Sequence, residues 1–333
     1  MTTTVDLNAV QKQEVLNVNR RQAQAVKDAA RAGAVPANAF VFFAAFDGTN
    51  NDLANSGSPQ NTNVAQLWLQ CSAGAEWGAR VRGQYYPGPG TKGTLTLSSW
   101  SYPTVTEQVI RTAKNAYNDF SREAAGWLRD HPGSQVTVVL TSFSRGGASA
   151  AIFSQMVYDR GLTDPAAPGN ALIPPGGVGV SAGVLFDPVM TGVTIDLTLA
   201  PNVWNIVDVF AVNEYRYVFK AADYSGQRGM ATVRMLGNHS DIGGQYDNGI
   251  GALSLDAATA FLRQSGLPLA GVNPARAFTT AALEVHEEAK NPDGTEIWSV
   301  YGSFNSFNVD STQRLLARVA GTSLPRYHEH RPV

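Results

Sequence analysis

The sequence predicts an α/β fold in which a mostly parallel central sheet carries helices on both faces. Short apolar runs alternate along the chain with longer stretches of helical periodicity, which is the pattern of repeated βαβ units. The run at residues 39–46 is continuously apolar, as expected for a strand that is covered on both faces. The runs end at polar or turn-forming residues, and the carboxyl ends of parallel strands share one edge of a sheet.

The predicted elements follow one another in a regular order. We expect strands at residues 39–46, 80–86, 135–141, 178–186 and 232–236. We expect helices at residues 62–72, 105–129, 146–158 and 253–265. Before the first predicted strand, the pattern of residues 6–33 predicts one or two helices with a thin apolar stripe. Residues 163–177 predict a surface loop, and residues 204–220 have a mixed pattern.

Composition narrows the class of protein. The 333 residues are 44% hydrophobic and 16% charged, which is enough to bury a large core. A net charge of −2 gives no general attraction to nucleic acid or to anionic membranes. The single cysteine, Cys71, excludes an internal disulfide framework. The first residues do not form a signal peptide, and no apolar run predicts a transmembrane helix.

Ser144 lies in the most informative turn of the sequence. It follows the predicted strand 135–141 and precedes a helix rich in small residues, in the run Ser142-Phe143-Ser144-Arg145-Gly146. A nucleophile elbow has this strand–turn–helix form, and its crowded turn requires small residues two positions before and after the serine. The following helix amino terminus favours a negative oxygen, and the backbone N–H of Arg145 is one candidate oxyanion donor.

Two further polar residues are expected to meet Ser144 at the same sheet edge. Asp187 follows the strand 178–186, and His239 follows the strand 232–236 within a glycine-containing segment that predicts a tight loop. The other histidines precede the nucleophile strand or lie in polar segments expected to be exposed, as His286 does. The order Ser–Asp–His is that of α/β-hydrolases, so an α/β-hydrolase-like fold is predicted. Gly48 or Thr49, after the first strand, is expected to supply the second oxyanion donor.

Each of these residues also has a simpler structural interpretation. Ser144 could occupy an ordinary strand–helix turn, Asp187 could shape a turn before proline, and His239 could be a buried structural histidine. A second functional hypothesis is a metal-dependent phosphoester hydrolase that uses the acidic and histidine side chains at the strand ends, namely Asp47, Asp52, Asp187, His239 and Asp241. A third is a non-catalytic, hydrolase-like scaffold of a secretion system. The joint pattern of three residues after three strands favours the serine hydrolase.

Six motifs in order then suggest a family. They are Phe46-Asp47-Gly48-Thr49-x-Asn51-Asp52, Tyr85-Tyr86-x-Gly88-x-Gly90-Thr91, Ser142-Phe143-Ser144-Arg145-Gly146, Phe186-Asp187-x-Val189, Asn213-Glu214-x-Arg216 and His239-Ser240-Asp241-Ile242-Gly243-Gly244. Over roughly residues 38–265 the chain resembles the α/β-hydrolase domain of type VI secretion phospholipase effectors with a Gly-Phe-Ser-Arg-Gly elbow. Ser142 departs from that pattern because it replaces the first glycine.

The resemblance implies roles for individual residues. Ser144 would be the nucleophile, His239 the base and Asp187 the orienting acid, with Asp241 as the alternative acid. Asp47 and Thr49 would line the site and help to organise the oxyanion hole. No cofactor or metal would be required.

The resemblance also implies a biological setting. The protein would be a lipase made in the cytoplasm and exported, without a signal peptide, by a specialised secretion system to a rival bacterium. Its partners would be a phospholipid or other ester substrate, a component of the secretion machine and an immunity protein. On this view residues 1–36 form an N-terminal helical segment, 37–270 the catalytic domain, and 271–333 a segment that completes or caps it.

Overall fold

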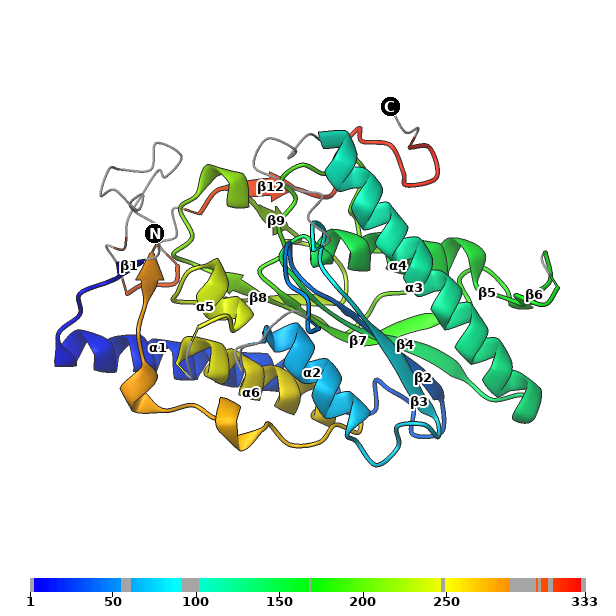
Figure 1. Ribbon diagram of the computed structural model, residues 1–333, viewed down its shortest axis with the longest axis horizontal. Coiled ribbons are helices and arrows are strands. Elements are labelled where there is room, and N and C mark those ends of the chain that lie inside the picture. Colours follow the sequence, from blue (N-terminus) through cyan, green and yellow to red (C-terminus); the bar gives the residue numbers. More distant parts are fainter. Residues whose placement is uncertain are drawn as a thin grey trace.

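In the computed structural model, six strands form a central sheet in which every neighbouring pair is parallel (Figure 1). The structure describes residues 3–54, 61–91, 102–167, 169–246, 249–287, 304, 307–310 and 314–330. The sheet strands, in chain order, are β2 (Phe40–Phe46), β3 (Val81–Tyr86), β4 (Val136–Phe143), β7 (Gly179–Phe186), β8 (Ile206–Ala211) and β10 (Met230–Met235).

The order of the strands across the sheet is β10-β8-β7-β4-β2-β3. The chain begins in β2, places β3 on one side of it, and then returns to build β4 and the later strands on the other side. The strand order therefore reverses between β2 and β4. In open α/β sheets, ligands bind at the carboxyl ends of the strands beside such a reversal. The segments that follow β2 and β4 contain Asp47-Gly48-Thr49 and Ser144.

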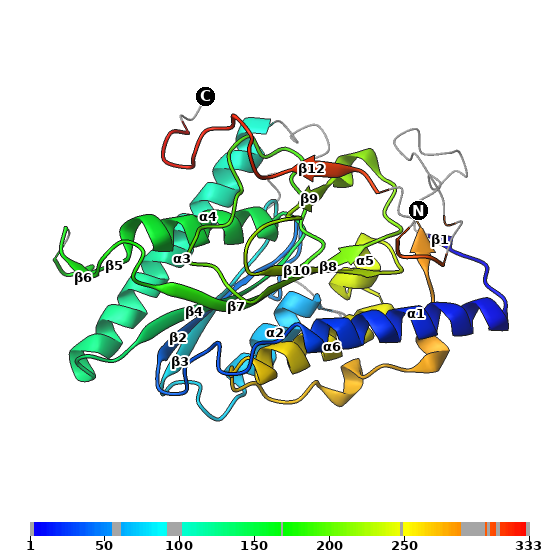
Figure 2. The same ribbon diagram turned by 180° about the vertical axis from the view of Figure 1, so that it is seen from behind.

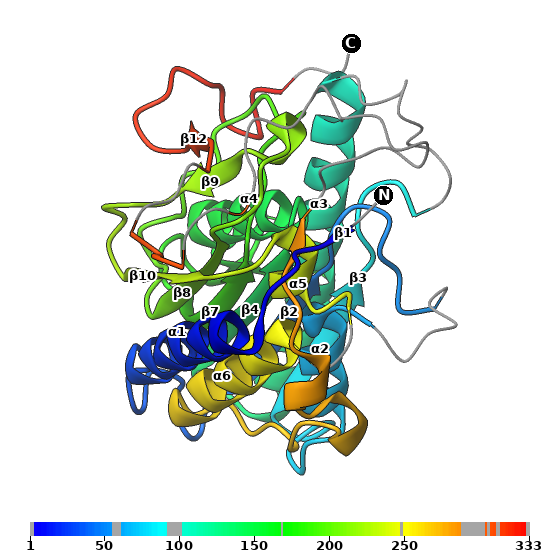
Figure 3. The ribbon, with the colours of Figure 1, turned by 90° about the vertical axis from the view of Figure 1, so that its left-hand side faces the viewer.

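Helices cover both faces of the sheet (Figure 2, Figure 3). On one face lie α3 (Tyr102–Asp130) and α4 (Gly146–Arg160); on the other lie α1 (Ala9–Asp28), α2 (Asn63–Ser72) and α6 (Ile250–Gln264). Successive residues of a strand point to opposite faces, so one apolar strand supplies two cores. In β2, Phe42 joins the core under α3 and α4, and Phe43 joins the core under α1, α2 and α6.

Short elements complete the described part of the chain. A five-residue helix, α5 (His239–Gly243), follows β10. The described residues also form the 3₁₀ turns η2 (Tyr217–Phe219), η3 (Pro274–Arg276) and η4 (Thr280–Ala282). Three small two-stranded sheets pair β1 (Thr3–Thr4) with β11 (His286–Glu287), β5 (Leu162–Thr163) with β6 (Ala171–Ile173), and β9 (Ala221–Asp223) with β12 (Leu316–Arg318).

The predicted α/β-hydrolase-like arrangement, a parallel sheet with helices on both faces, is confirmed. Three segments differ from the sequence prediction. The mixed segment 204–220 contains the buried strand β8, in which Asp208 interrupts an otherwise apolar run. The segment around His239 begins a short helix rather than a tight loop, because Asn238 caps α5 and Gly244, at φ 78°, ends it. The loop expected at 163–177 carries part of the β5–β6 hairpin.

The terminal segments pack on the sheet domain. Helix α1 lies against α6 and β10, and β12 in the C-terminal segment pairs with β9. Boundaries at residues 36 and 270 remain a prediction. Among the helices in the described ranges, none combines the length and apolar character needed to cross a bilayer.

We predict that Phe42→Ala lowers the free energy of unfolding by about 3–5 kcal/mol, because it leaves a cavity at the centre of the sheet. Phe42 is fully buried, and its ring lies 5.8 Å from that of Phe120 and 6.3 Å from that of Phe153. Urea unfolding followed by circular dichroism measures the change. The control is Val10→Ala, at a site that is 77% exposed, where a change within about 0.5 kcal/mol is expected. Equal effects of the two substitutions would contradict this account of the core.

Candidate active site

Ser144 occupies a sharp turn between β4 and α4. Its φ of +54° lies in the left-handed region, which costs a residue with a side chain on the order of 1–3 kcal/mol. Hydrogen bonds from neighbouring segments hold this conformation. The Ser144 N–H donates to the Phe186 carbonyl at 3.1 Å, and the Ser144 carbonyl accepts from the Val189 N–H at 3.1 Å. This is the backbone form of a nucleophile elbow.

The two glycines after Arg145 are required by close neighbours of the turn. A Cβ atom at Gly146 would lie 2.2 Å from the Phe46 carbonyl oxygen, and one at Gly147 would lie 2.6 Å from Pro188 Cβ. Ser142, which replaces the first glycine of the elbow pattern, is fully buried in β4.

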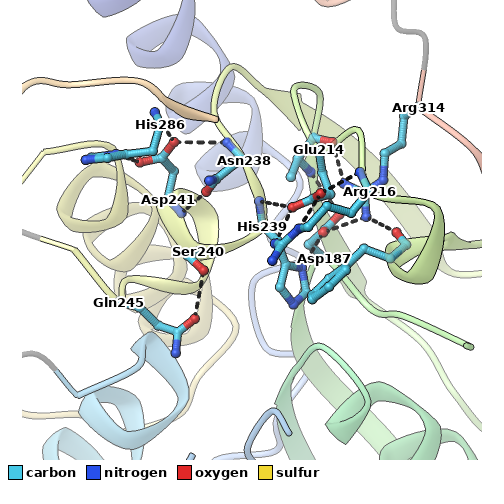
Figure 4. A network of polar contacts seen from close by, with 12 residues as sticks. Asp187, Glu214, Arg216, Asn238, His239, Ser240, Asp241, Gln245, His286 and Arg314 are labelled. Carbon is cyan, nitrogen blue, oxygen red and sulfur yellow. Dashed lines mark hydrogen bonds and ion pairs between the residues drawn. The ribbon is translucent and has the colours of Figure 1, made fainter. Parts of the chain in front are cut away.

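Asp187 and His239 are in direct contact (Figure 4). The His239 Nδ1–H donates to Asp187 Oδ2 at 2.6 Å, and both side chains are almost completely buried. Asp187 follows β7 with a φ of +41°, and His239 is the first residue of α5. The structure thus brings together the predicted acid and base, which are 52 residues apart in sequence. This hydrogen bond leaves Nε2 as the proton-accepting nitrogen of a neutral imidazole.

Two aromatic rings hold the imidazole of His239. The ring of Phe143, the residue before Ser144, stacks on it at a centroid distance of 4.5 Å. Phe219 from η2 meets it edge-on at 4.9 Å. Burial lowers the pKa of His239, and the contact with Asp187 opposes that effect. The ring is consequently kept neutral and beside the residue that precedes the candidate nucleophile, as a general base requires.

Asp241, the alternative acid, contacts a different histidine. His286 Nδ1 lies 2.7 Å from Asp241 Oδ1, and the backbone N–H groups of Asn238 and His286 donate to Asp241 Oδ2. The structure therefore places Asp241 in the cap of α5 rather than on the imidazole of His239. His286 is not exposed, contrary to the sequence expectation, because the β1–β11 pairing and the ring of Tyr246 at 3.9 Å enclose it.

The loop after β2 lies against the elbow. Asp47 is buried and accepts hydrogen bonds from Tyr85 Oη at 2.6 Å, Thr62 Oγ1 at 2.7 Å and the Gly48 N–H at 2.7 Å. Burial raises the pKa of Asp47 to about 6, although these hydrogen bonds oppose the rise. A Cβ atom at Gly48 would lie 2.9 Å from Ser144 Cβ. The predicted oxyanion loop is thus next to the candidate nucleophile.

The side chain of Arg145 joins two loops of the site. Although it carries a charge, Arg145 is only 1% exposed. Its Nε donates to the Thr191 carbonyl at 2.7 Å, and its Nη1 donates to Thr49 Oγ1 at 3.1 Å. Burial and the positive charge of Arg216 lower the pKa of the Arg145 guanidinium to about 10. This arginine therefore ties the loop after β2 to the loop that follows Asp187.

Three charged residues around the Asp187–His239 pair had no role in the sequence prediction. Glu214 is buried and paired with Arg216, whose Nε lies 2.8 Å from Glu214 Oε1, and the His239 N–H donates to Glu214 Oε2 at 3.4 Å. The motif Asn213-Glu214-x-Arg216 contains both residues of this ion pair, but the sequence assigned no role to either of them. Arg314 contacts Asp187 Oδ2 at 2.8 Å (Figure 4). No sequence signal pointed to Arg314, because it lies 127 residues from Asp187.

The side chains of the metal hypothesis do not share one site. Asp187 contacts His239, Asp241 contacts His286, and Asp47 accepts hydrogen bonds from Tyr85 and Thr62. Within the described part of the chain, no three acidic, histidine or cysteine side chains form a group suited to a metal ion.

Comparison with known proteins gives distant structural similarities only. No protein-family model matches the chain, and no curated protein matches it significantly. An uncharacterised protein from Pseudomonas aeruginosa is similar over 84% of this chain and 52% of its own, with 17% identity and a TM-score of 0.48. The Tle1 effector bound to the VgrG spike of the type 6 secretion system is similar over 63% and 52%, with 19% identity and a TM-score of 0.44. An acetyl xylan esterase is similar over 68% and 98%, with 13% identity and a TM-score of 0.33. The chain spans about half the length of the first two proteins.

We predict that Asp47→Asn removes a pH-dependent loss of stability. The pKa of Asp47 is raised in the folded protein, from 3.8 to about 6. The contribution of Asp47 to the free energy of unfolding is therefore fully present below pH 4 and is lost as the pH rises to about 6. The unfolding free energy of the wild type should fall relative to that of Asp47→Asn by about 3 kcal/mol across this range. Parallel urea titrations at several pH values measure the difference; a difference that stays constant or grows with pH would contradict the assignment.

Proposed function

We propose that the protein is a serine ester hydrolase that acts through an acyl-enzyme, with Ser144 as nucleophile, His239 as base and Asp187 as orienting acid. The observation that carries the proposal is the buried Asp187–His239 contact beside a serine with a left-handed backbone. Phe143 links the two parts, since it precedes Ser144 and stacks on the imidazole of His239. A serine hydroxyl becomes an effective nucleophile only with such a base, and the base needs an acid to orient it.

In the proposed reaction, His239 Nε2 takes the proton of Ser144 Oγ as the oxygen attacks the ester carbonyl. Asp187 stabilises the imidazolium that forms, and His239 then delivers the proton to the leaving alcohol. Water, deprotonated by His239, next attacks the acyl-enzyme; as the bond from the acyl carbon to Ser144 Oγ breaks and the acid leaves, His239 returns the proton to Ser144 Oγ. The lowered pKa of His239 suits the first step, because the base must be neutral before it accepts a proton.

We assign the oxyanion hole to two backbone groups. One is the N–H of Arg145, which caps α4 directly after Ser144. The other belongs to the loop after β2. The Gly48 N–H donates to the carboxylate of Asp47, so we assign the second donor to Thr49. Arg145 supports this assignment, because its side chain donates to Thr49 Oγ1 and so positions that loop.

For the substrate class, we propose a phospholipid. The support for this proposal is the set of six ordered motifs that resemble the phospholipase effectors of type VI secretion. The same resemblance supports an antibacterial effector exported by a secretion system, with a component of that system and an immunity protein as partners.

We predict that Ser144→Ala lowers ester turnover by about 10⁶-fold and abolishes labelling by a fluorophosphonate probe, because the nucleophile is lost. The matched control is Ser149→Ala, a buried serine in α4 outside the triad, which should keep both activities. Mass spectrometry of the labelled peptide locates the adduct. Failure to label Ser144 in folded wild-type protein would favour a non-catalytic scaffold.

A substrate screen with wild type and Ser144→Ala then identifies the ester. Phospholipids, lysophospholipids and short-chain esters are compared, and phospholipids are expected to give the highest kcat/KM. Hydrolysis confined to short-chain esters would contradict the phospholipid assignment and leave the serine mechanism in place. Loss of activity in EDTA, restored by a divalent cation, would instead support the metal-dependent phosphoester hydrolase.

We predict opposite outcomes for the two buried acids near α5. Asp187→Asn should lower kcat by about 10⁴-fold, because the amide no longer fixes the tautomer of His239. Asp241→Asn changes the cap of the helix that carries His239 and the contact with His286, so it should lower stability by about 1–3 kcal/mol and leave kcat within tenfold. Steady-state kinetics and thermal unfolding of both variants provide the test. A crippling Asp241→Asn beside a mild Asp187→Asn would reverse the assignment of the acid.

A further inference from the structure

Arg314 reaches the candidate active site from the C-terminal segment. The β12 strand that follows it pairs in parallel with β9, and the Ala221 N–H donates to the carbonyl of Leu315 at 3.1 Å. These contacts anchor the segment above the carboxyl edge of the sheet (Figure 3). The side chain of Arg314 points inward and is 1% exposed.

The guanidinium of Arg314 connects three parts of the site. Its Nη2 donates to Asp187 Oδ2 at 2.8 Å and to the Phe219 carbonyl at 2.7 Å, and its Nη1 donates to the Ala211 carbonyl at 3.0 Å. Asp187 follows β7, Ala211 ends β8, and Phe219 is the residue whose ring meets His239 edge-on. The planar fork of an arginine is suited to such a set of acceptors, whereas a lysine ammonium is a single point charge.

The same oxygen of Asp187 accepts from both His239 and Arg314. Oδ2 lies 2.6 Å from His239 Nδ1 and 2.8 Å from Arg314 Nη2, while Oδ1 accepts from the Ala211 N–H at 3.0 Å. The carboxylate is therefore held by donors on both oxygens (Figure 4). Arg314 both fixes its orientation and competes with the imidazole for its negative charge.

We propose that Arg314 is a positioning residue of the hydrolase reaction: it keeps the buried Asp187 ionised and aligned on His239, and it limits the basicity of that histidine. The proposal rests on the proposed function of Ser144, Asp187 and His239. It assigns to the C-terminal segment a part in the reaction that the sequence does not indicate.

The surrounding charges support this role. Asp187 faces Arg314, His239 and Asp208, and His239 also faces the Glu214–Arg216 pair. Burial and the charge of Asp187 raise the pKa of Asp208 well above its usual range, which favours the neutral form of this neighbour. Arg314 is the largest influence that lowers the pKa of Asp187 against the effect of burial. Without Arg314, the positive charge that faces Asp187 would be lost, so the coupled Asp187–His239 pair would bind a proton more readily and the pKa observed at the imidazole would rise.

The test compares Arg314→Met and Arg314→Gln, which remove the charge, with Arg314→Lys, which retains it. The control is Arg326→Met, in the same segment, whose partner is the partly exposed Asp159. The pKa of His239 is measured by NMR of ¹³C-labelled imidazole rings, with His239→Gln for assignment. The pH profile of kcat/KM is measured with an ester substrate.

The neutral variants should raise the pKa of His239 by about one unit and lower kcat at pH 7 by roughly 10- to 100-fold, with KM nearly unchanged. Arg314→Lys should leave that pKa close to the wild-type value, and the control should change neither quantity. A wild-type pKa of His239 in folded Arg314→Met or Arg314→Gln would overturn the proposal. So would a shift in Arg314→Lys as large as theirs.

If neither neutral variant folds, Arg314→Lys decides the question. One ammonium cannot reproduce the planar fork, so kcat should fall while the pKa of His239 is kept; a wild-type kcat would overturn the positioning role. The NMR titration does not depend on turnover. A shifted pKa in a protein whose Ser144 is never labelled would therefore count against the proposed function alone, whereas normal labelling with an unmoved pKa would count against Arg314.

Discussion

Burial of the Asp187 carboxylate is the constraint on which the arrangement of the site depends. A charge removed from water is strongly unfavourable unless hydrogen bonds and an opposite charge compensate for it. Here the donors come from the end of β8, from α5 and from the C-terminal segment, through Ala211, His239 and Arg314. Satisfying one carboxylate therefore fixes the relative positions of three segments that are far apart in sequence.

Two buried aspartates near the carboxyl edge of the sheet show that surroundings, rather than residue type, decide the role of an acid. Asp47 accepts hydrogen bonds from the neutral groups of Tyr85, Thr62 and Gly48, and its pKa is raised to about 6. Asp187 faces a guanidinium, and its pKa is lowered. An acid that supports a histidine base must stay ionised when the imidazole becomes charged. Of the two, only Asp187 has the surroundings for that task.

The part of the site that follows from local pattern was predictable, and the part that depends on distant segments was not. Ser144, Asp187 and His239 each follow a strand, and parallel strands bring such residues to one edge. The sequence left open the choice between Asp187 and Asp241. Asp241 is close to His239 along the chain, and Asp187 was expected to lie close to it across the edge of the sheet. Strand β8 was missed because a buried Asp208 interrupts its apolar run. The positions of Arg314 and of the partly buried His286 depend on strand pairings that residue periodicity does not report.

The turns that carry Ser144 and Asp187 support each other. Both residues have positive φ angles, +54° at Ser144 and +41° at Asp187, so neither turn is relaxed by itself. The Ser144 N–H donates to the carbonyl of Phe186, and the Val189 N–H donates to the carbonyl of Ser144. These bonds extend the β4–β7 ladder beyond the sheet and offset the strain of both turns together. Because β4 and β7 are neighbours, the turn of Asp187 lies beside the turn of Ser144, and a change that relaxed one turn would displace the other.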